Sequence, residues 1–271
     1  MGIVIITIPG EAKRAFANSL HQLTGENVDL VVIQKPKPNH HSLLERLKRL
    51  YNSVGLVALP TEIFYAILLR LNESTRKTLE YFRERSGIIS SLEPGYIPKT
   101  LETISANSEE VYKNLEILSP DLIVIWGNTI IKPHIVKTAK RAINLHMGLC
   151  PYYRGAIANQ HAVMQRQLDK IGATIHYAEA KVDSGNILKT LTADVSKRPK
   201  EMFRDLNDRA ERAYLDLAHK LSRGETVESI PQDIRGSENF LLKNWTPRVR
   251  YNLAKQILEW ERTGILEPGD I

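Results

Sequence analysis

Two short apolar runs separated by one amphipathic segment constrain the fold of this chain most strongly. The runs are Gly2–Thr7 and Val28–Ile33, and both are rich in β-branched residues, as in strands that a parallel sheet buries on both faces. Between them Pro9 and Gly10 break the chain, and Glu11–Leu23 then carries apolar residues at helical spacing. A strand, a helix and a second strand in this order predict the start of a doubly wound sheet.

The same alternation returns later in the chain. Further strands are expected at Leu122–Trp126, Ala142–His146 and Gly172–Tyr177, with a short one at Val227–Pro231. Helices are expected at Ser108–Leu118, Ile130–Lys140, Ala158–Gln167 and Lys200–Ser222. The predicted fold class is therefore α/β: a Rossmann-like, doubly wound, mostly parallel sheet with helices on both faces, plus a helical C-terminal appendage.

Residues 1–224 are expected to form one domain that carries a mostly helical insertion at about residues 35–107, and residues 225–271 a C-terminal extension. Within the insertion, Ser42–Tyr51 has the spacing of an amphipathic helix with a basic face. His40 and His41 follow a proline-interrupted loop without a further metal-ligand pattern, which favours a solvated loop. Trp245 and Trp260 indicate that the extension packs on the domain or on another subunit, so a homo-oligomer is one expectation.

Composition limits the kinds of partner that this chain is expected to bind. The net charge of +6 and the sequence pI of 9.3 favour anionic partners such as phosphates or carboxylates. The basic residues are spread along the chain, so a nucleic acid is not expected. A single cysteine, Cys150, excludes an intramolecular disulfide framework and a multi-cysteine metal site. No segment reads as apolar over the roughly 18 residues that a membrane span needs, and Met1–Pro9 reads as a strand, so a cytoplasmic protein without membrane contact is expected.

The turn after the first strand lacks the sequence pattern of one common class of binding site. It reads Pro-Gly-Glu-Ala at residues 9–12 and lacks the G-x-G-x-x-G pattern of a dinucleotide site. A nicotinamide-dependent dehydrogenase is therefore disfavoured.

Three polar residues have the chemistry of acyl transfer to an amine. Asn144 and His146 stand two residues apart in a strand and so face the same way, and Gly148 then ends the strand. Asp183 precedes Ser184 and Gly185 in a predicted turn that presents a carboxylate. An amide can stabilise an oxyanion, an imidazole can move protons near neutral pH, and a carboxylate can orient the imidazole. The alternative is a strand end with solvent-facing polar residues.

These residues lie in three motifs that resemble a known family. The motifs are N-L-H-M-G-L-C-P-Y-Y-R-G at residues 144–155, G-A-T-I-H at 172–176 and V-D-S-G-N-I-L at 182–188. Together they resemble the formyltransferases that use 10-formyltetrahydrofolate, and the resemblance is most specific from Pro120 to Leu188. The first strands and helix agree with the Rossmann-like domain of that family.

The resemblance implies roles for named residues. It makes Asn144, His146 and Asp183 the catalytic trio, with Asn144 and a protonated His146 stabilising the oxyanion. It places the folate donor against Asn128, Thr129, Ile130, Ile131, Lys181 and Val182. It places the acceptor near Arg154, Gly155 and Asn159, where Arg154 either binds the acceptor or holds the loop. It implies 10-formyltetrahydrofolate as co-substrate and no metal.

Departures from the family pattern bear on the acceptor. Met147-Gly148 stands where many relatives have Pro-Ser, and Asn159 where proline is common. The Pro9-Gly10 turn differs from the phosphate loop of the glycinamide ribonucleotide enzymes, and the tail reads as too short and too helical for the β-barrel domain of methionyl-tRNA formyltransferases. This favours the amino-sugar N-formyltransferase branch, acting on a primary amine of a nucleotide-linked sugar on a surface-glycan or pseudaminic acid type of route.

Several alternatives stay open. They are a glycinamide ribonucleotide- or methionyl-tRNA-type formyltransferase, a formyltetrahydrofolate hydrolase, and a non-catalytic folate- or nucleotide-binding relative.

Overall fold

The computed structural model describes residues 1–36, 42–82, 95–127, 130–179, 181–235 and 237–266. Seven strands form its central sheet, in the order β3-β2-β1-β4-β5-β7-β8. Their bounds are β1 Ile3–Thr7, β2 Val28–Gln34, β3 Thr100–Thr103, β4 Leu122–Trp126, β5 Arg141–His146, β7 Gly172–Tyr177 and β8 Ile187–Thr192. The first five strands of this order pair in parallel, whereas β7 pairs antiparallel with both of its neighbours, β5 and β8. The expected mostly parallel α/β sheet is confirmed.

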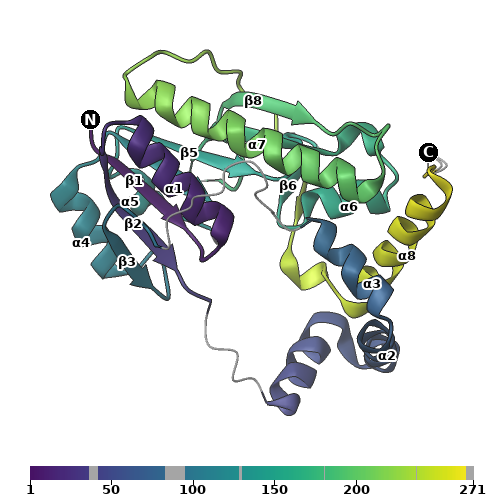
Figure 1. The fold of residues 1–271 in the computed structure, drawn as a ribbon. Helices are drawn as coiled ribbons and strands as arrows, with labels where there is room; N and C mark the ends of the chain where they lie inside the picture. Colours follow the sequence, from purple (N-terminus) through teal and green to yellow (C-terminus); the bar gives the residue numbers. More distant parts are fainter. Residues whose placement is uncertain (37–41, 83–94, 128–129, 180, 236, 267–271) are drawn as a thin grey trace.

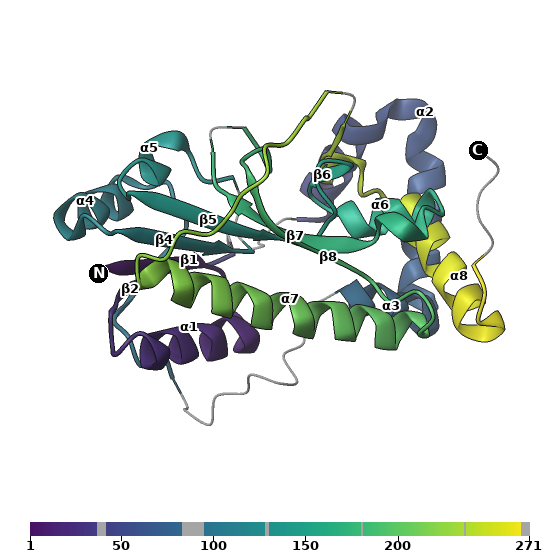
Figure 2. The same cartoon turned by 90° about the horizontal axis from the view of Figure 1, so that it is seen from above.

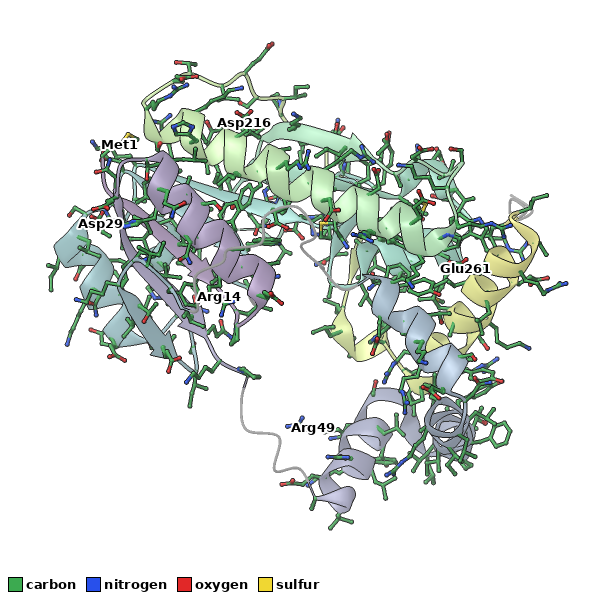
Figure 3. All side chains as sticks on the ribbon, in the orientation of Figure 1. Met1, Arg14, Asp29, Arg49, Asp216 and Glu261 are labelled. Carbon is green, nitrogen blue, oxygen red and sulfur yellow. The ribbon has the colours of Figure 1, made fainter. Side chains whose placement is uncertain are left out.

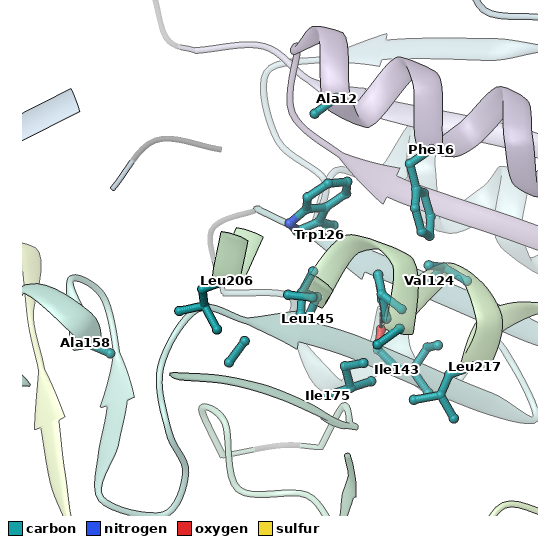
Figure 4. Close-up of a cluster of buried hydrophobic side chains, with 14 of the residues drawn as sticks. Ala12, Phe16, Val124, Trp126, Ile143, Leu145, Ala158, Ile175, Leu206 and Leu217 are labelled. Carbon is teal, nitrogen blue, oxygen red and sulfur yellow. Dashed lines mark hydrogen bonds between the residues drawn. The ribbon is translucent and has the colours of Figure 1, made fainter. Parts of the chain in front are cut away.

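Helices cover both faces of this sheet (Figures 1 and 2). Helices α1 (Glu11–Leu23) and α7 (Pro199–Ser222) lie on one face, and α4 (Glu109–Leu118) and α5 (Pro133–Val136) on the other. The larger core lies under α1 and α7, where Phe16, Val124 and Leu206 are fully buried (Figure 4). β1 and β4 are buried at every position, which explains their unbroken aliphatic sequences.

Some elements differ from the expectation. β3 lies within the segment that the sequence assigned to a helical insertion, and β8 follows the Asp183 turn without having been predicted. Both are sheet-edge strands with mixed exposure, so their sequences lack an apolar run. The strand expected at Val227–Pro231 is reduced to one isolated bridge between Ile187 and Ile230. The helix expected at Ile130–Lys140 is a single helical segment of four residues, α5.

A second group of elements lies beside the sheet. It contains α2 (Leu43–Leu71), α3 (Glu73–Thr78), the 3₁₀ helix η1 (Leu79–Phe82) and α8 (Pro247–Thr263). Ser42 starts α2 with a capping box, in which its side chain accepts from the Glu45 N–H and the Glu45 carboxylate accepts from the Ser42 N–H. α8 packs against α2, α3, α6 and α7, and its Trp260 is buried within this chain. The tail aromatics are thus used internally and give no argument for a subunit interface.

The expectation that no segment is apolar enough to cross a membrane is wrong. Residues 44–71 of α2 have the length and apolar composition of a membrane-spanning helix, although Gly55 breaks the helical backbone within them. Glu62, the one charged residue between Leu50 and Leu69, interrupts this stretch, so a search for an unbroken apolar run overlooks it.

Short elements connect the sheet to this group. The strand β6 (Tyr153–Gly155) pairs in parallel with β9 (Glu238–Phe240), and α6 (Ala158–Met164) follows β6 directly. Two further 3₁₀ helices are η2 (Leu168–Lys170) and η3 (Leu242–Asn244).

Candidate active site

The strand β5 delivers Asn144 and His146 to the end of the sheet, as the spacing predicts. β5 lies between β4 and β7 in the sheet, and its last residue, His146, is 8% exposed. Because the two positions lie on one face of the strand, the amide of Asn144 and the imidazole of His146 can approach one partner.

That partner is Asp183. Its Oδ1 accepts a 3.3 Å hydrogen bond from Asn144 Nδ2, and its Oδ2 lies 3.4 Å from His146 Nδ1. Asp183 has a left-handed backbone with a φ of 46°. Residues other than glycine seldom adopt this conformation, and they usually do so where the surrounding structure enforces it. The loop between β7 and β8 thus returns the carboxylate to the two residues of β5. The structure brings the predicted trio together.

The charges of this trio are set by opposing effects. For Asp183, burial raises the pKa, but His146, His176 and the Gly155 N–H together outweigh it and lower the pKa to about 2. For His146, burial lowers the pKa and prevails over the opposing influence of Asp183. The site therefore holds a carboxylate and a neutral imidazole near pH 7. The expectation of a protonated His146 in the reaction stays a prediction: burial disfavours the cation, whereas a carboxylate and a carbonyl oxygen face the two ring nitrogens.

A backbone carbonyl holds the other side of the His146 ring. His146 Nε2 donates a 2.9 Å hydrogen bond to the Tyr153 carbonyl oxygen. Gly148 makes room for this contact, because a Cβ at residue 148 would lie 2.9 Å from that same oxygen and would overlap the ring. The glycine that departs from the family pattern is thus a steric requirement of the His146 position.

A second imidazole completes the surroundings of Asp183. His176 Nε2 lies 3.3 Å from Asp183 Oδ1 and 3.2 Å from Asn144 Nδ2, and its Nδ1 donates to the Tyr177 carbonyl at 2.7 Å. It is 2% exposed. The pairing of β5 with β7 places His176 opposite Asn144. A sequence pattern gives no such cross-strand register, so this contact was not predicted.

The predicted donor-binding residues lie in two loops. Asn128 and Thr129 lie outside the described residues. The carbonyl of Ile130 accepts a 2.9 Å hydrogen bond from Asn107 Nδ2, and Ile131 packs beside the smaller core. Lys181 is exposed, and the neighbouring Val182 lies in the loop that carries Asp183. Their roles in donor binding stay predictions.

The predicted acceptor-side residues make structural contacts of their own. Arg154 donates to the Val182 carbonyl at 3.1 Å and to Ser237 Oγ at 2.9 Å, so its guanidinium holds the Asp183 loop. Both polar atoms of the Asn159 amide pair with the backbone of Gly172 at 2.9 Å. Of the two roles proposed for Arg154, these contacts favour the loop-holding one. The role of Asn159 toward a substrate stays a prediction.

A hollow opens beside His146. Its lining is aromatic, aliphatic and amide in character, and none of the described residues that form it is a Lys, Arg, Asp or Glu. It is lined by Phe82, His146, Met147, Gly155, Ile157, Asn159, Gln160, Phe203 and Asn207. Phe82 lies on η1 and Phe203 on α7, and the centroids of their rings are 4.3 Å apart. Neither residue belongs to a sequence motif that could have predicted its place in the hollow.

Two further side chains bear on the chemistry. Cys150 is buried, and burial raises the pKa of its thiol to about 12, so it stays protonated and has no nucleophilic thiolate. Within the described part of the chain, no group of three or more His, Cys, Asp and Glu side chains is placed to hold a metal ion.

Known proteins resemble this chain in sequence and in fold. The Formyl transferase family model matches residues 3–216. The methionyl-tRNA formyltransferase of a Nitratiruptor species is 31% identical over 180 residues, which is 65% of this chain and 56% of the relative. The chain therefore spans about half the length of the curated relatives that it matches.

Two solved structures share the fold. A sugar N-formyltransferase from Shewanella sp FDAARGOS_354 has a TM-score of 0.53 at 13% identity, covering 94% of this chain and 88% of the other. An N-formyltransferase from Helicobacter canadensis, solved with folinic acid and dTDP-3-aminofucose, has a TM-score of 0.51 at 13% identity, covering 89% and 71%. With its family model matched over most of its length, this chain belongs to the formyl transferase family.

Proposed function

We propose that this protein transfers the formyl group of 10-formyltetrahydrofolate to a primary amine of a nucleotide-linked amino sugar. The observation that carries the proposal is the contact of Asp183 with both Asn144 and His146, at 3.3 and 3.4 Å, at the end of β5. The family match supports formyl transfer. The sugar acceptor rests on weaker support, described below.

The charges of the site define the proton path. The acceptor amine attacks the formyl carbon, and the carbonyl oxygen becomes an oxyanion. Asn144 Nδ2 donates to this oxygen, in place of one of its present contacts with Asp183 and His176. Because Nε2 of the neutral His146 donates to the Tyr153 carbonyl, the proton of the attacking amine goes to Nδ1, where the adjacent Asp183 carboxylate stabilises the resulting imidazolium. His146 then returns that proton to the leaving nitrogen of tetrahydrofolate as the bond to carbon breaks, which leaves a formamide.

The hollow beside His146 fits the amine-bearing part of an acceptor. A sugar ring presents apolar C–H faces and hydroxyl groups, which suit the rings of Phe82 and Phe203 and the amides of Gln160 and Asn207. The uncharged character of the described lining residues favours an uncharged group here. The Helicobacter canadensis neighbour was solved with dTDP-3-aminofucose, and the Shewanella neighbour is a sugar N-formyltransferase.

A second candidate acceptor is methionyl-tRNA. It is favoured by the sequence relatives, which are methionyl-tRNA formyltransferases at 28–31% identity over half of their length. The apolar part of the same hollow, with Met147 and Phe82, also suits a methionine side chain.

The test is a formyl-transfer assay that follows tetrahydrofolate release. The donor is 10-formyltetrahydrofolate, and the acceptors are dTDP- and UDP-linked amino sugars, methionyl-tRNA, glycinamide ribonucleotide and water. Turnover with one sugar supports the proposal, and turnover with methionyl-tRNA alone supports the second candidate. Formate release without an acceptor identifies a hydrolase. Folate binding without turnover on any acceptor identifies a binding protein.

Matched variants separate chemistry from folding. Asn144→Ala, His146→Ala and Asp183→Asn are each expected to lower kcat by at least about a hundredfold. His134→Ala is the control, because His134 is an exposed histidine on α5, outside the site. A His146→Ala enzyme with normal turnover would refute the proposed proton path.

A further inference from the structure

The outward side of α2 is an apolar stripe that no described element covers. Gly55 breaks α2 with a φ of 78°, and the second arm, residues 56–71, continues to Asn72. On this arm Leu56, Phe64, Ile67 and Leu71 are spaced by eight, three and four residues and are exposed, as is Val57 at 96%. In Figure 3 the arm lies at the edge of the molecule, away from the sheet. Contiguous apolar surface of this kind marks an interaction site.

The opposite side of the same arm packs against α8 and the residue that caps it. Glu62 is 6% exposed and accepts 2.9 Å hydrogen bonds from Thr246 Oγ1 and from the Arg248 N–H at the start of α8. Tyr65 packs on Tyr251 of α8 with ring centroids 5.4 Å apart. Glu62 is the only charged residue in the sequence from Leu50 to Leu69, and it faces inward. The outward side of the arm therefore carries no charge over this stretch.

Basic residues outnumber acidic ones at both ends of this stretch, where the exposed acidic residues are Glu45 and Glu73. Arg46, Lys48 and Arg49 are exposed at the start of α2, where Figure 3 labels Arg49, and Arg70 is exposed at its end. Arg76 is exposed on α3, which follows directly. An apolar helix side bordered by cations complements a lipid bilayer with anionic headgroups.

The lengths of the two arms of α2 indicate how it would lie on a membrane. At 1.5 Å per residue the arms before and after Gly55 are about 18 and about 24 Å long, and both are shorter than the roughly 30 Å hydrocarbon core of a bilayer. The second arm is also held to α8. α2 therefore suits a position in the plane of the headgroups and not a crossing of the membrane.

We infer that α2 docks this protein on a membrane surface rich in anionic lipid, with Leu56, Val57, Phe64, Ile67 and Leu71 inserted below the headgroups. This replaces the expectation of no membrane contact, which depended on the absence of a long apolar segment. A second copy of the chain fits this surface less well. In a two-fold arrangement of α2 against itself, the basic ends would meet each other whether the helices ran parallel or antiparallel.

The docking surface is continuous with the candidate site. The chain runs from α2 through α3 into η1, whose last residue, Phe82, lines the hollow beside His146. Docking would therefore fix the position of one wall of the hollow relative to the bilayer. The docking itself is independent of the proposed acceptor and of catalysis.

The test is co-sedimentation of the full chain with vesicles of phosphatidylcholine, with and without phosphatidylglycerol, at low and high salt. Binding to the anionic vesicles is expected, with affinity at least about tenfold lower without phosphatidylglycerol or at high salt. Val57→Glu should lower the affinity by at least about tenfold. Ile117→Glu on α4 is the matched control, because Ile117 is 83% exposed and lies far from α2 in the sequence; it should bind as the wild type does. The triple variant Arg46→Gln, Lys48→Gln, Arg49→Gln should bind anionic vesicles less tightly and with a weaker salt dependence.

The outcomes separate the occupants of this surface. Circular dichroism of each variant shows whether the fold is kept, and the extreme exposure of Val57 makes its replacement a mild one. No sedimentation with any vesicle, or equal sedimentation of Val57→Glu and wild type, would overturn the inference. So would a dimer in analytical ultracentrifugation that Val57→Glu dissociates, because a second copy would then cover α2.

Discussion

The backbone N–H of Gly155 donates a 2.8 Å hydrogen bond to Oδ2 of Asp183. This bond joins the end of β6 to the loop between β7 and β8, two segments that are 28 residues apart. The same carboxylate oxygen faces His146 Nδ1. Gly155 therefore sets the position of the carboxylate on which the charge of the trio depends, although its own side chain is a hydrogen.

Replacing Gly155 by alanine should reduce both activity and stability. Gly155 has a φ of 81°, and a Cβ there would lie 2.6 Å from the Phe240 carbonyl oxygen on β9. The backbone must move, and the hydrogen bond to Asp183 moves with it. We expect a loss of at least about 2 kcal/mol of unfolding free energy. We expect kcat to fall by about tenfold or more, measured by tetrahydrofolate release.

Gly224→Ala is the control for this prediction. Gly224 has a φ of 79°, but no atom of the described residues lies within 4 Å of its added Cβ. It should cost about 1 kcal/mol through backbone strain alone and leave kcat unchanged. Equal effects of the two variants would show that strain, and not the contact with Asp183, explains the loss.

The pH dependence of turnover should identify the active form of His146. Burial lowers the pKa of His146 below its ordinary value of about 6.5, so the neutral ring dominates at pH 7. If the neutral ring is the base, kcat/KM stays level through neutral pH and falls only below about pH 6.5 as the ring becomes protonated. A kcat/KM that rises as the pH falls from 7 toward 6 would instead identify the imidazolium as the active form.

Asp183 should stabilise the fold at neutral pH and lose that contribution in acid. Its folded pKa of about 2 lies below the unfolded value of about 3.9. A depressed pKa contributes stability above the unfolded value, and the contribution is lost as the pH falls through the folded value. The amount is roughly 2 to 3 kcal/mol. Urea unfolding of wild type and Asp183→Asn between pH 7 and pH 3 measures it.

The unfolding free energies of wild type and Asp183→Asn should converge as the pH falls. Asp183→Asn should be less stable at pH 7 and lose less stability on acidification. Asp216→Asn, on an exposed part of α7, is the control and should follow the wild-type curve. A constant gap between wild type and Asp183→Asn at every pH would mean that packing, and not charge, makes Asp183 important.

Local patterns predicted the elements whose burial is uniform. β1, β4 and α1 follow from runs and spacings that are visible in the sequence, and α1 has the predicted bounds. The pair Asn144 and His146 follows from the period of a strand. Contacts that depend on strand register, or on distant segments of the chain folding back together, could not be predicted from such patterns. His176 reaches Asp183 through the pairing of β5 with β7, and Phe82 reaches the hollow from within the inserted segment, at the end of η1.

The protonation state of His146 could not be read from the sequence for a related reason. A sequence gives the types of the groups but not how deeply they are buried, and burial decides between the cation and the neutral ring. The apolar length of α2 was missed because its internal charge, Glu62, interrupts the apolar run in the sequence, whereas in the fold that charge is hidden against α8. Both points depend on the surroundings of a residue, which only the folded chain defines.

Tyr214 offers a test of how the sheet supports this site. Its hydroxyl, on α7, accepts a 3.0 Å hydrogen bond from the Ile125 N–H of β4 and lies 2.8 and 3.0 Å from the carbonyl oxygens of Ile125 and Ile143. It thus joins α7 to both β4 and β5, the strand that ends at His146. Its ring also stacks on Phe16 with centroids 5.3 Å apart, a contact that phenylalanine would keep.

Tyr214→Phe should therefore lose the hydroxyl contacts alone. A buried N–H and two carbonyl groups would lack this partner, which should cost about 1 to 3 kcal/mol of unfolding free energy, measured by urea denaturation. Tyr112→Phe is the control, because the Tyr112 hydroxyl bonds to Glu116 on the exposed side of α4 and should contribute less than about 0.5 kcal/mol. Because Ile143 immediately precedes Asn144, Tyr214→Phe should also lower kcat by a few fold while leaving KM for the amine unchanged. An unchanged unfolding free energy would mean that water replaces the hydroxyl between the strands, and the link from α7 to β5 would then have no part in holding Asn144 in place.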